Sequence, residues 1–209
     1  MWLHLGLFFL FAIIFLITTF FMGLSSRNND VLLNENFVLT FDDGPHPENT
    51  LKIAQICKSE NVPAIFFFLG EEAQKYPNIV KTVSDMGFEI GTHGMIHVRH
   101  DTKSYGFNYD SLSRSKKIIE NIIGKPIKRF RPPYGRRYVA TMMAETATGL
   151  QHTGWSSCID DWKDISEDAQ ISGALSTLNK GGIILAHDVR DKTVNILPRL
   201  ISECRAKLN

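Results

Sequence analysis

The chain has 209 residues, of which 44% are apolar and 22% are charged, and its formal net charge is +1. This length and composition suit one domain with a sizeable core and exclude a disordered chain. The balanced charge, without a run of Lys and Arg, gives no reason to expect a nucleic-acid partner. Three widely spaced cysteines, Cys57, Cys158 and Cys204, exclude a disulfide framework and a cysteine-type zinc motif.

The first 23 residues are dominated by an apolar run from Trp2 to Gly23, and polar residues follow from Ser25. A run of about 20 apolar residues can cross a bilayer as a helix and is longer than the core of a signal peptide. We therefore expect a hydrophobic N-terminal helix in residues 1–23 that anchors the chain in a membrane, a linker over residues 24–36, and an extracytoplasmic domain over residues 37–209. Because small residues follow the run, secretion after cleavage of a signal peptide is the alternative.

From Phe37 onward, apolar or β-branched runs alternate with segments of helical spacing. The predicted strands cover residues 37–41, 64–69, 88–91, 128–131, 150–155 and 183–187. The predicted helices cover residues 48–60, 71–86, 108–123, 137–148, 166–179 and 193–207. A repeated strand–helix order favours parallel strands wrapped by helices, in an open sheet or a barrel. In a barrel, residues that carry chemistry follow the C-terminal ends of the strands.

Two adjacent carboxylates, Asp42 and Asp43, end the first apolar run and are followed by Gly44 and Pro45. Successive side chains of a strand point to opposite faces, so packing explains paired acids at a strand end poorly. The two charges repel each other unless a cation or a proton separates them, which favours a bound metal. For these residues taken alone, a surface turn with local hydrogen bonds is the alternative.

Two histidines, His93 and His97, follow the predicted strand 88–91 at positions i and i+4. On a helical turn this spacing puts both rings on one side, where neutral ring nitrogens can bind one cation. With Asp43 they form a set of two histidines and one carboxylate, which leaves a fourth position for water as catalytic zinc sites do. His100 is close enough in the sequence to be a rival ligand.

The predicted strand 128–131 ends at Arg131 and runs into Pro132, Pro133 and Tyr134. Two prolines fix the backbone, and a rigid loop can aim a backbone N–H at a developing oxyanion. Arg131 can pair with a carboxylate and lower its pKa. A tight strand-to-helix loop without further function is the alternative.

Five segments taken in order resemble the polysaccharide deacetylases of carbohydrate esterase family 4, over about residues 37–200. These segments are Thr40–Gly44, Thr92–His97, Arg129–Gly135, Asp160–Trp162 and Leu185–Asp188. Five ordered motifs are far more specific than any one of them. The resemblance implies a distorted (β/α) barrel of about seven strands and a metal-dependent removal of N-acetyl groups from glycans that contain N-acetylglucosamine, such as chitin-like polymers or peptidoglycan.

The resemblance also implies roles for individual residues. The metal ligands would be Asp43, His93 and His97, and the metal would be zinc, with cobalt or manganese as alternatives. The proton-transfer groups would be Asp42 as general base and His187 as general acid. The supporting residues would be Arg131 beside the base, Asp161 in the charge network, the Tyr134 backbone N–H as oxyanion donor, and Trp162 and Leu185 as walls for the acetyl methyl group.

Two positions depart from the family pattern. Gly94 stands where a serine or threonine is usual after the first metal histidine, so a hydroxyl that would brace the loop is missing and weaker metal binding is expected. Cys158 stands where an acid is usual, three residues before Asp161. The catalytic and metal-binding set is complete nonetheless, which favours an active enzyme.

Two other functions stay open at this point. A membrane-tethered carbohydrate-binding protein would keep the groove without turnover, and a metal amidase would act on small amides that are not sugars. An amidase of that kind needs a closed cavity, and no long insertion in this sequence is an obvious lid. We expect a monomer whose partners are an N-acetylated glycan and, through residues 1–23, a membrane.

Overall fold

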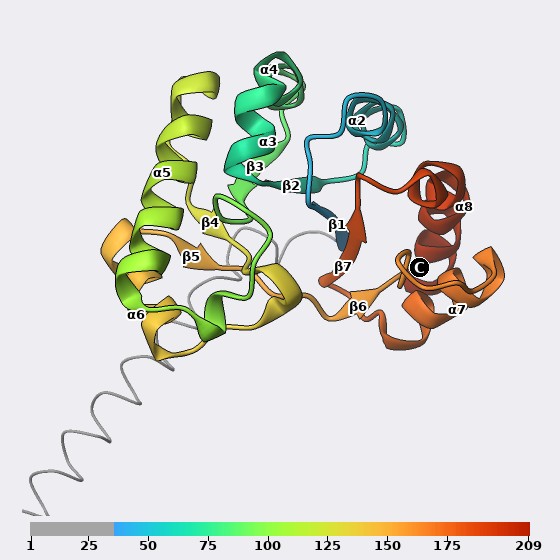
Figure 1. Cartoon of the computed structure of the whole chain (residues 1–209). Coiled ribbons are helices and arrows are strands. Elements are labelled where there is room, and N and C mark those ends of the chain that lie inside the picture. The colour runs from blue at the N-terminus through green and yellow to red at the C-terminus, as the bar shows by residue number, and fades with distance from the viewer. Residues whose placement is uncertain (1–35) are drawn as a thin grey trace, which may run out of the picture. The chain divides into compact units, whose positions relative to one another are not determined.

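The computed structural model describes residues 36–209, which belong to one compact unit and contain a parallel sheet of seven strands (Figure 1). The strand order across the sheet is β5-β4-β3-β2-β1-β7-β6, and every pairing is parallel. The strands are β1 Phe37–Asp42, β2 Ala64–Phe68, β3 Glu89–Thr92, β4 Arg129–Phe130, β5 Gln151–His152, β6 Ser157–Cys158 and β7 Gly182–His187.

Helices connect all successive strands except β5 and β6, and they lie around the outside of the curved sheet (Figure 1). The α-helices are α2 Asn49–Ser59, α3 Gly70–Lys75, α4 Pro77–Asp85, α5 Tyr105–Ile123, α6 Val139–Thr148, α7 Glu167–Thr177 and α8 Asp191–Leu208. Two short 3₁₀ turns, η2 His100–Thr102 and η3 Pro133–Gly135, follow strands β3 and β4.

The sheet is curled but open, because its two edge strands, β5 and β6, pair with β4 and β7 and not with each other. The sequence-based prediction of a barrel is therefore confirmed only as a curled parallel sheet of seven strands covered by helices. The predicted N-terminal helix lies outside the described residues. Within residues 36–209, no helix combines the length and the apolar character needed to cross a bilayer.

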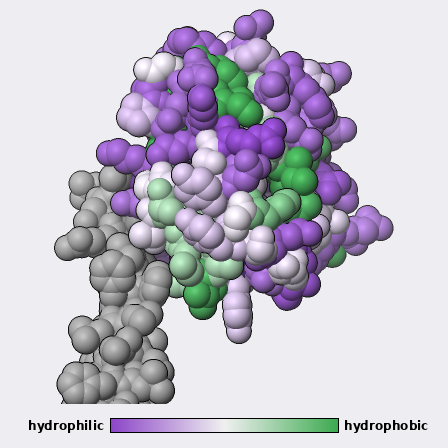
Figure 2. Space-filling view, turned by 60° about the vertical axis from the view of Figure 1, so that its left-hand side comes forward, coloured by the Kyte–Doolittle hydropathy of each residue, from purple (hydrophilic) through white to green (hydrophobic). Residues whose placement is uncertain are grey.

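The core forms where the central strands meet the helices. All six residues of β1 and all five of β2 are buried, as expected of strands covered on both faces. The Phe66 ring packs against the rings of Phe41 and Phe88, with centroid distances of 5.1 and 5.6 Å. In contrast, the face seen in Figure 2 is largely hydrophilic, with hydrophobic side chains in separate patches.

Two elements differ from the sequence-based prediction. The helix expected over residues 71–86 is two helices, because Pro77 opens α4 at its first position and lacks the N–H that would continue α3. Strand β6 was not predicted, because its two residues are Ser157 and Cys158, neither of which carries a strong strand signal.

Strand register brings the chemistry-bearing segments to one edge of the sheet. Asp42 at the end of β1 is the direct neighbour of His187 at the end of β7. On the other side of β1, Phe68 pairs with Thr92, which immediately precedes His93. Thr92 pairs in turn with Phe130, which immediately precedes Arg131. Residues far apart in the sequence therefore meet at the C-terminal strand ends.

Candidate active site

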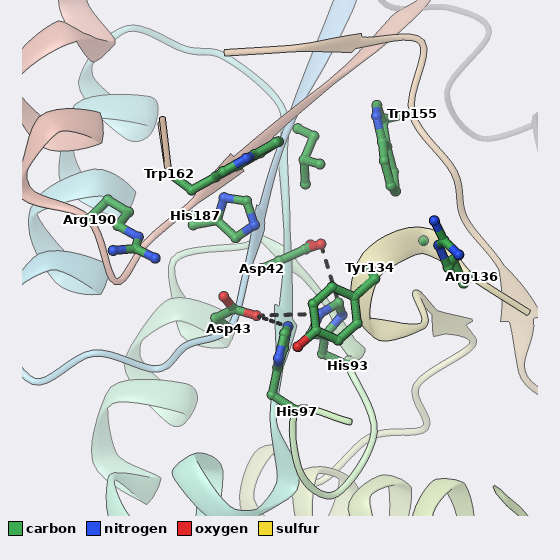
Figure 3. A pocket seen from close by; sticks show the side chains of 12 residues that line it. Asp42, Asp43, His93, His97, Tyr134, Arg136, Trp155, Trp162, His187 and Arg190 are labelled. Carbon is green, nitrogen blue, oxygen red and sulfur yellow. Dashed lines mark ion pairs between the residues drawn. The ribbon is translucent and has the colours of Figure 1, made fainter. Parts of the chain in front are cut away.

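A pocket of about 510 Å³ opens at these strand ends (Figure 3). It contains most of the residues that the sequence singled out, together with several that it did not. Its lining comprises Asp42, Asp43, His93, His97, Tyr134, Gly135, Arg136, Trp155, Trp162, Leu185, His187 and Arg190.

Three of these residues could hold a metal ion. Oδ1 of Asp43 lies 3.4 Å from Nε2 of His93 and 3.3 Å from Nε2 of His97. The possible ligand atoms of the three residues all lie within 4.8 Å of one another. His100, the rival ligand, is outside this group and fully buried against the rings of Phe107 and Phe130.

The donor set fits a divalent cation. Oδ1 of Asp43 is buried and accepts no hydrogen bond, although a carboxylate oxygen removed from water normally has a partner. Burial lowers the pKa of His93 to about 3, so its ring is neutral and offers a lone pair. Asp43 also has φ of +78°, a left-handed conformation that is costly for a residue other than glycine and clusters at functional sites.

Asp42 is held by a buried arginine. Nη1 of Arg131 donates to Oδ1 of Asp42 at 2.9 Å and to Oγ1 of Thr40 at 2.8 Å. The remaining guanidinium donors bind the carbonyl oxygens of Thr153 and Gly154 at 3.0 and 2.8 Å. Arg131 is completely buried, so its planar head group fixes where the carboxylate points.

Arg131 lowers the pKa of Asp42, as expected, but a larger opposing effect makes the net shift upward. Burial raises the pKa of Asp42 above its usual value, and the attraction of Arg131 and His187 offsets this only in part. Removing a carboxylate from water disfavours its charged form, and Asp42 is only 3% exposed. A carboxylate with a raised pKa is a stronger base than an ordinary aspartate.

His187 faces the same pocket and is held from behind by Asp161. Nδ1 of His187 lies 2.7 Å from Oδ1 of Asp161, and the His187 backbone N–H donates to Oδ2 of the same carboxylate at 2.7 Å. The hydroxyl of Thr193 donates to that oxygen at 2.6 Å. Because Asp161 engages Nδ1, the other ring nitrogen is the one left for proton transfer.

The pKa of His187 is raised. Burial alone would lower it, but the hydrogen bond and charge of Asp161, with Asp42 and Asp43 further away, outweigh that effect. The contacts therefore agree with the expectation that Asp161 supports this histidine. Asp188 points the other way, where Oδ2 accepts a 2.5 Å hydrogen bond from Thr50.

The remaining predicted residues lie at the rim or wall of the pocket. Tyr134 and Trp162 are 59% and 47% exposed, whereas Leu185 is buried. The Trp162 ring meets the His187 ring edge-on, with centroids 5.2 Å apart. The backbone N–H of Tyr134 donates to no carbonyl oxygen among the described residues, and its φ is +62°.

Three lining residues were missed by sequence reasoning, namely Trp155, Arg136 and Arg190. Each lies within a few residues of a motif or a strand end, so the same rule that placed the other site residues could have found them. Trp155 also covers the buried arginine, with its ring centroid 5.5 Å from Cζ of Arg131.

Comparison with known proteins agrees with this geometry. Residues 33–153, more than half of the chain, match the family profile described as polysaccharide deacetylase. The chain belongs to the polysaccharide deacetylase family. The family's fold also agrees, because the family 4 carbohydrate esterase from Streptomyces lividans, solved with acetate, superposes with a TM-score of 0.78 at 29% identity over 84% of this chain and 91% of that one.

Two curated polysaccharide deacetylases are similar in sequence. A peptidoglycan-N-acetylglucosamine deacetylase from Bacillus cereus is 33% identical over 81% of this chain and 63% of its own length. A chitooligosaccharide deacetylase from Azorhizobium caulinodans is 31% identical over 72% of each protein. The chain therefore spans somewhat less than two thirds of the Bacillus cereus protein.

Gly94, the first departure from the family pattern, lies close to the buried His100 ring. Gly94 has φ of +89°, and a Cβ atom there would lie 2.7 Å from Nε2 of the buried His100. The loop is braced by other hydroxyls, because Gly94 N–H donates to Thr92 and Met95 N–H donates to Ser111 at 3.1 and 2.9 Å. The expected weakening of metal binding is therefore opposed by hydrogen bonds that this chain supplies elsewhere.

The second departure, Cys158, keeps a polar contact that the usual acid could make. Its sulfur accepts a hydrogen bond from the Asp160 backbone N–H at 3.3 Å. Burial raises the pKa of Cys158 to about 12, so the side chain is a neutral thiol. Cys57, Cys158 and Cys204 are all free.

Proposed function

We propose that this chain is a metal-dependent N-deacetylase of glycans that contain N-acetylglucosamine. One observation carries the proposal: a buried carboxylate held by Arg131 and a histidine held by Asp161 flank the Asp43, His93 and His97 group inside one pocket. The names of the similar polysaccharide deacetylases, which act on peptidoglycan and chitooligosaccharides, support the choice of substrate class.

In the proposed reaction Asp42 takes the proton of the attacking water. Its Oδ1 is occupied by Arg131, so the other carboxylate oxygen, Oδ2, is the acceptor. Burial raises the pKa of Asp42 and strengthens it as a base, while Arg131 and His187 oppose that rise. A positioned proton acceptor of this kind contributes about 10²–10⁴-fold to a rate.

His187 would protonate the departing amine nitrogen through Nε2. The raised pKa of His187 favours the protonated ring that a general acid needs. As the proton leaves, the Asp161 carboxylate keeps the hydrogen on Nδ1, so the ring does not need to turn. The proposed mechanism requires Asp42 to be ionised and His187 to be protonated at the same pH.

The ion that we propose is zinc, with cobalt or manganese as alternatives, held by Asp43, His93 and His97. When bound, a divalent ion would polarise the amide carbonyl and lower the pKa of the attacking water. Tyr134 lines the same pocket, and its backbone N–H, which has no carbonyl partner within residues 36–209, would donate to the carbonyl oxygen as negative charge develops there. Trp162 and Leu185 would enclose the acetyl methyl group.

The exposed rim favours a polymer over a small amide. Tyr134, Trp155 and Trp162 are between 38% and 59% exposed, so the pocket is open to solvent where a chain of sugars must enter and leave. A small-molecule amidase is expected to enclose its substrate. A binding protein without turnover would not need a buried carboxylate and a carboxylate-supported histidine beside the candidate metal ligands.

Acetate release tests the proposed function. The purified protein, with zinc restored, should release acetate from an N-acetylglucosamine oligomer or from peptidoglycan glycan chains. Activity should disappear after thorough chelation and return when the metal is added back. Binding of either glycan without acetate release under any metal condition would favour the binding-protein alternative instead.

We also propose that residues 1–23 anchor the protein in a membrane with the catalytic domain outside the cytoplasm. The support is the almost entirely apolar run from Trp2 to Gly23 in the sequence, in which His4 is the only titratable side chain. The mature protein should sediment with membranes and retain its N-terminal peptide in mass spectrometry. A soluble mature form that begins after Ser25 would support the secreted alternative.

A further inference from the structure

Two arginines line the pocket without an internal partner. Arg136 and Arg190 are exposed, and neither guanidinium forms an ion pair or a side-chain hydrogen bond with another residue in the range 36–209. In Figure 3 they lie on opposite sides of Asp43 and His97, with Arg190 near Trp162 and Arg136 near Trp155. A chain of sugars crossing the pocket would therefore meet a positive charge on each side of the reacting unit.

Helix stability does not explain Arg190. It is the N-cap residue of α8 and makes no capping hydrogen bond from its side chain. That position favours Ser, Thr, Asp or Asn, and the positive end of the helix dipole disfavours a cation there. The adjacent acid, Asp191, is engaged by the amide of Asn49 at 2.9 Å. A residue that opposes the local preference of a helix is a candidate for function.

Internal ion pairing does not explain Arg136 either. The acid whose pKa it helps to lower, Asp101, is already bound by both Nε and Nη2 of Arg99, at 3.1 and 2.6 Å. The turn that presents Arg136 is tightly packed, because a Cβ atom on Gly135 would lie 2.2 Å from the Trp155 ring. The backbone before Arg136 is therefore fixed in place beside the pocket.

We propose that Arg136 and Arg190 bind carboxylates on the two sugars that flank the reacting N-acetylglucosamine. The preferred substrate would be an acidic, alternating glycan of the peptidoglycan type and not a neutral homopolymer such as chitin. In the acidic glycan each N-acetylglucosamine lies between two sugars that bear a lactyl group, so an anion is available on both sides. Arginine matches a carboxylate with two parallel N–H donors. This inference rests on the proposed deacetylase function.

The carboxylate can come from two sources, the lactyl group itself or the peptide attached to it. Four oligosaccharides of equal length separate these sources. They are a chitopentaose, an alternating pentasaccharide with free lactyl carboxylates, the same pentasaccharide with its carboxylates converted to methylamides, and the same pentasaccharide with stem peptides attached. The ratio of kcat/KM for each compound to that for chitopentaose measures the preference without depending on the absolute activity.

The lactyl or peptide compound should be preferred over chitopentaose and over the methylamide. Arg136→Gln and Arg190→Gln should each reduce that ratio by about three- to tenfold, the range for exposed to partly desolvated charge pairs. The preference should also weaken between about 0.05 and 0.5 M salt because ions screen exposed charges. Arg114→Gln removes an exposed arginine of α5 that lies outside the pocket lining and should leave the ratio unchanged.

Equal kcat/KM values for the carboxylate and methylamide compounds would overturn the inference, as would an unchanged ratio in both pocket variants. Either result could occur while acetate is released from all four compounds, in which case the proposed deacetylase function stands. If no compound releases acetate, binding to Asp42→Asn protein by calorimetry still decides the matter. A preference for the carboxylate compound that Arg136→Gln abolishes would then support the anion sites without turnover.

Discussion

The two carboxylates at the end of β1 are neighbours in sequence but have different surroundings. Asp42 is buried, and its side chain is bound to Arg131. The Asp43 side chain is 21% exposed and faces the Nε2 atoms of His93 and His97. A backbone with φ of +78° at Asp43 turns its side chain away from that of Asp42. The left-handed backbone at one residue thus separates the proposed proton acceptor from the candidate metal ligand.

Substituting each carboxylate by its amide should separate the two roles. Asp43→Asn should lose metal and activity together, because an uncharged amide is a weaker ligand and the site has three protein ligands. Asp42→Asn should keep its metal but lose about 10²–10⁴-fold in turnover, because an amide cannot accept the water proton. Elemental analysis and acetate release measure the two effects. A metal-free Asp42→Asn protein, or a loaded and active Asp43→Asn protein, would reverse the assignment.

The contact between Asp161 and His187 should determine how activity depends on pH at the alkaline end. In the proposed mechanism His187 must be protonated, so activity should be lost as the pH rises through the raised pKa of this residue. Asp161→Asn removes the charge that raises this pKa, so the alkaline limb of the pH–rate profile should move to lower pH. Asp160→Asn is the control, because Asp160 pairs with Lys163 and does not contact His187. Identical alkaline limbs in wild type and Asp161→Asn would contradict the assigned role.

At the scale of elements, one buried hydrogen-bond chain ties the loop after β1 to the end of β7. The hydroxyl of Thr50, in the first turn of α2, accepts from the His46 backbone N–H at 2.7 Å and donates to Asp188 at 2.5 Å. Both Thr50 and Asp188 are fully buried. The Asp188 carboxylate also lies so close to Gly44 that a Cβ atom there would be 2.1 Å from Oδ2.

Thr50→Val should therefore destabilise the protein by about 1–3 kcal/mol, because the substitution keeps the shape but leaves two buried polar groups without a partner. Thr82→Val is the matched control, since Thr82 is an exposed helical threonine whose hydroxyl bonds to the Asn78 carbonyl oxygen. The control should change the free energy of unfolding by no more than about 0.5 kcal/mol. Denaturant unfolding of both variants measures the difference, and equal values would show that this hydrogen-bond chain contributes little.

The sequence predicts elements well where periodicity is strong and poorly where packing decides. Six predicted strands and the long helices correspond to structured segments because their apolar spacing is regular. Strand β6 has two residues, Ser157 and Cys158, and it forms because they pair with β7. No local sequence pattern predicts this pairing. Pro77 alone would have predicted that the helix expected over residues 71–86 is divided into two.

The candidate site shows the same limit. Its motif residues were predictable because strand ends converge in a parallel sheet. The net direction of the pKa of Asp42 was not, because it depends on how completely the fold buries the carboxylate beside Arg131. Trp155, Arg136 and Arg190 lie outside the motifs but close to a motif or a strand end, so the strand-end rule points to them while the loop conformations decide that they line the pocket.

At the scale of the whole molecule, a nearly neutral chain still has a pH-dependent stability, because buried carboxyls contribute individually. Glu145 on α6 is 5% exposed, and Oε2 lies 3.0 Å from Nη1 of Arg137. Burial raises the pKa of Glu145 from 4.5 to about 7, although Arg137 opposes the shift. Because the folded pKa exceeds the unfolded one, the unfolded state ionises first as the pH rises.

The stabilising effect of protonated Glu145 should thus be complete below about pH 4.5 and be lost as the pH rises toward about 7. Glu145→Gln cannot ionise, so its free energy of unfolding relative to wild type should increase over this window, by up to about 3 kcal/mol at about 1.4 kcal/mol per pKa unit. Urea unfolding at pH 4.5 and 7.5 measures the change. Glu203→Gln, which alters an exposed carboxylate of α8 paired with Arg199, should differ from wild type by nearly the same small amount at both pH values. A constant difference between Glu145→Gln and wild type across the window would mean that Arg137 keeps Glu145 ionised in the folded protein.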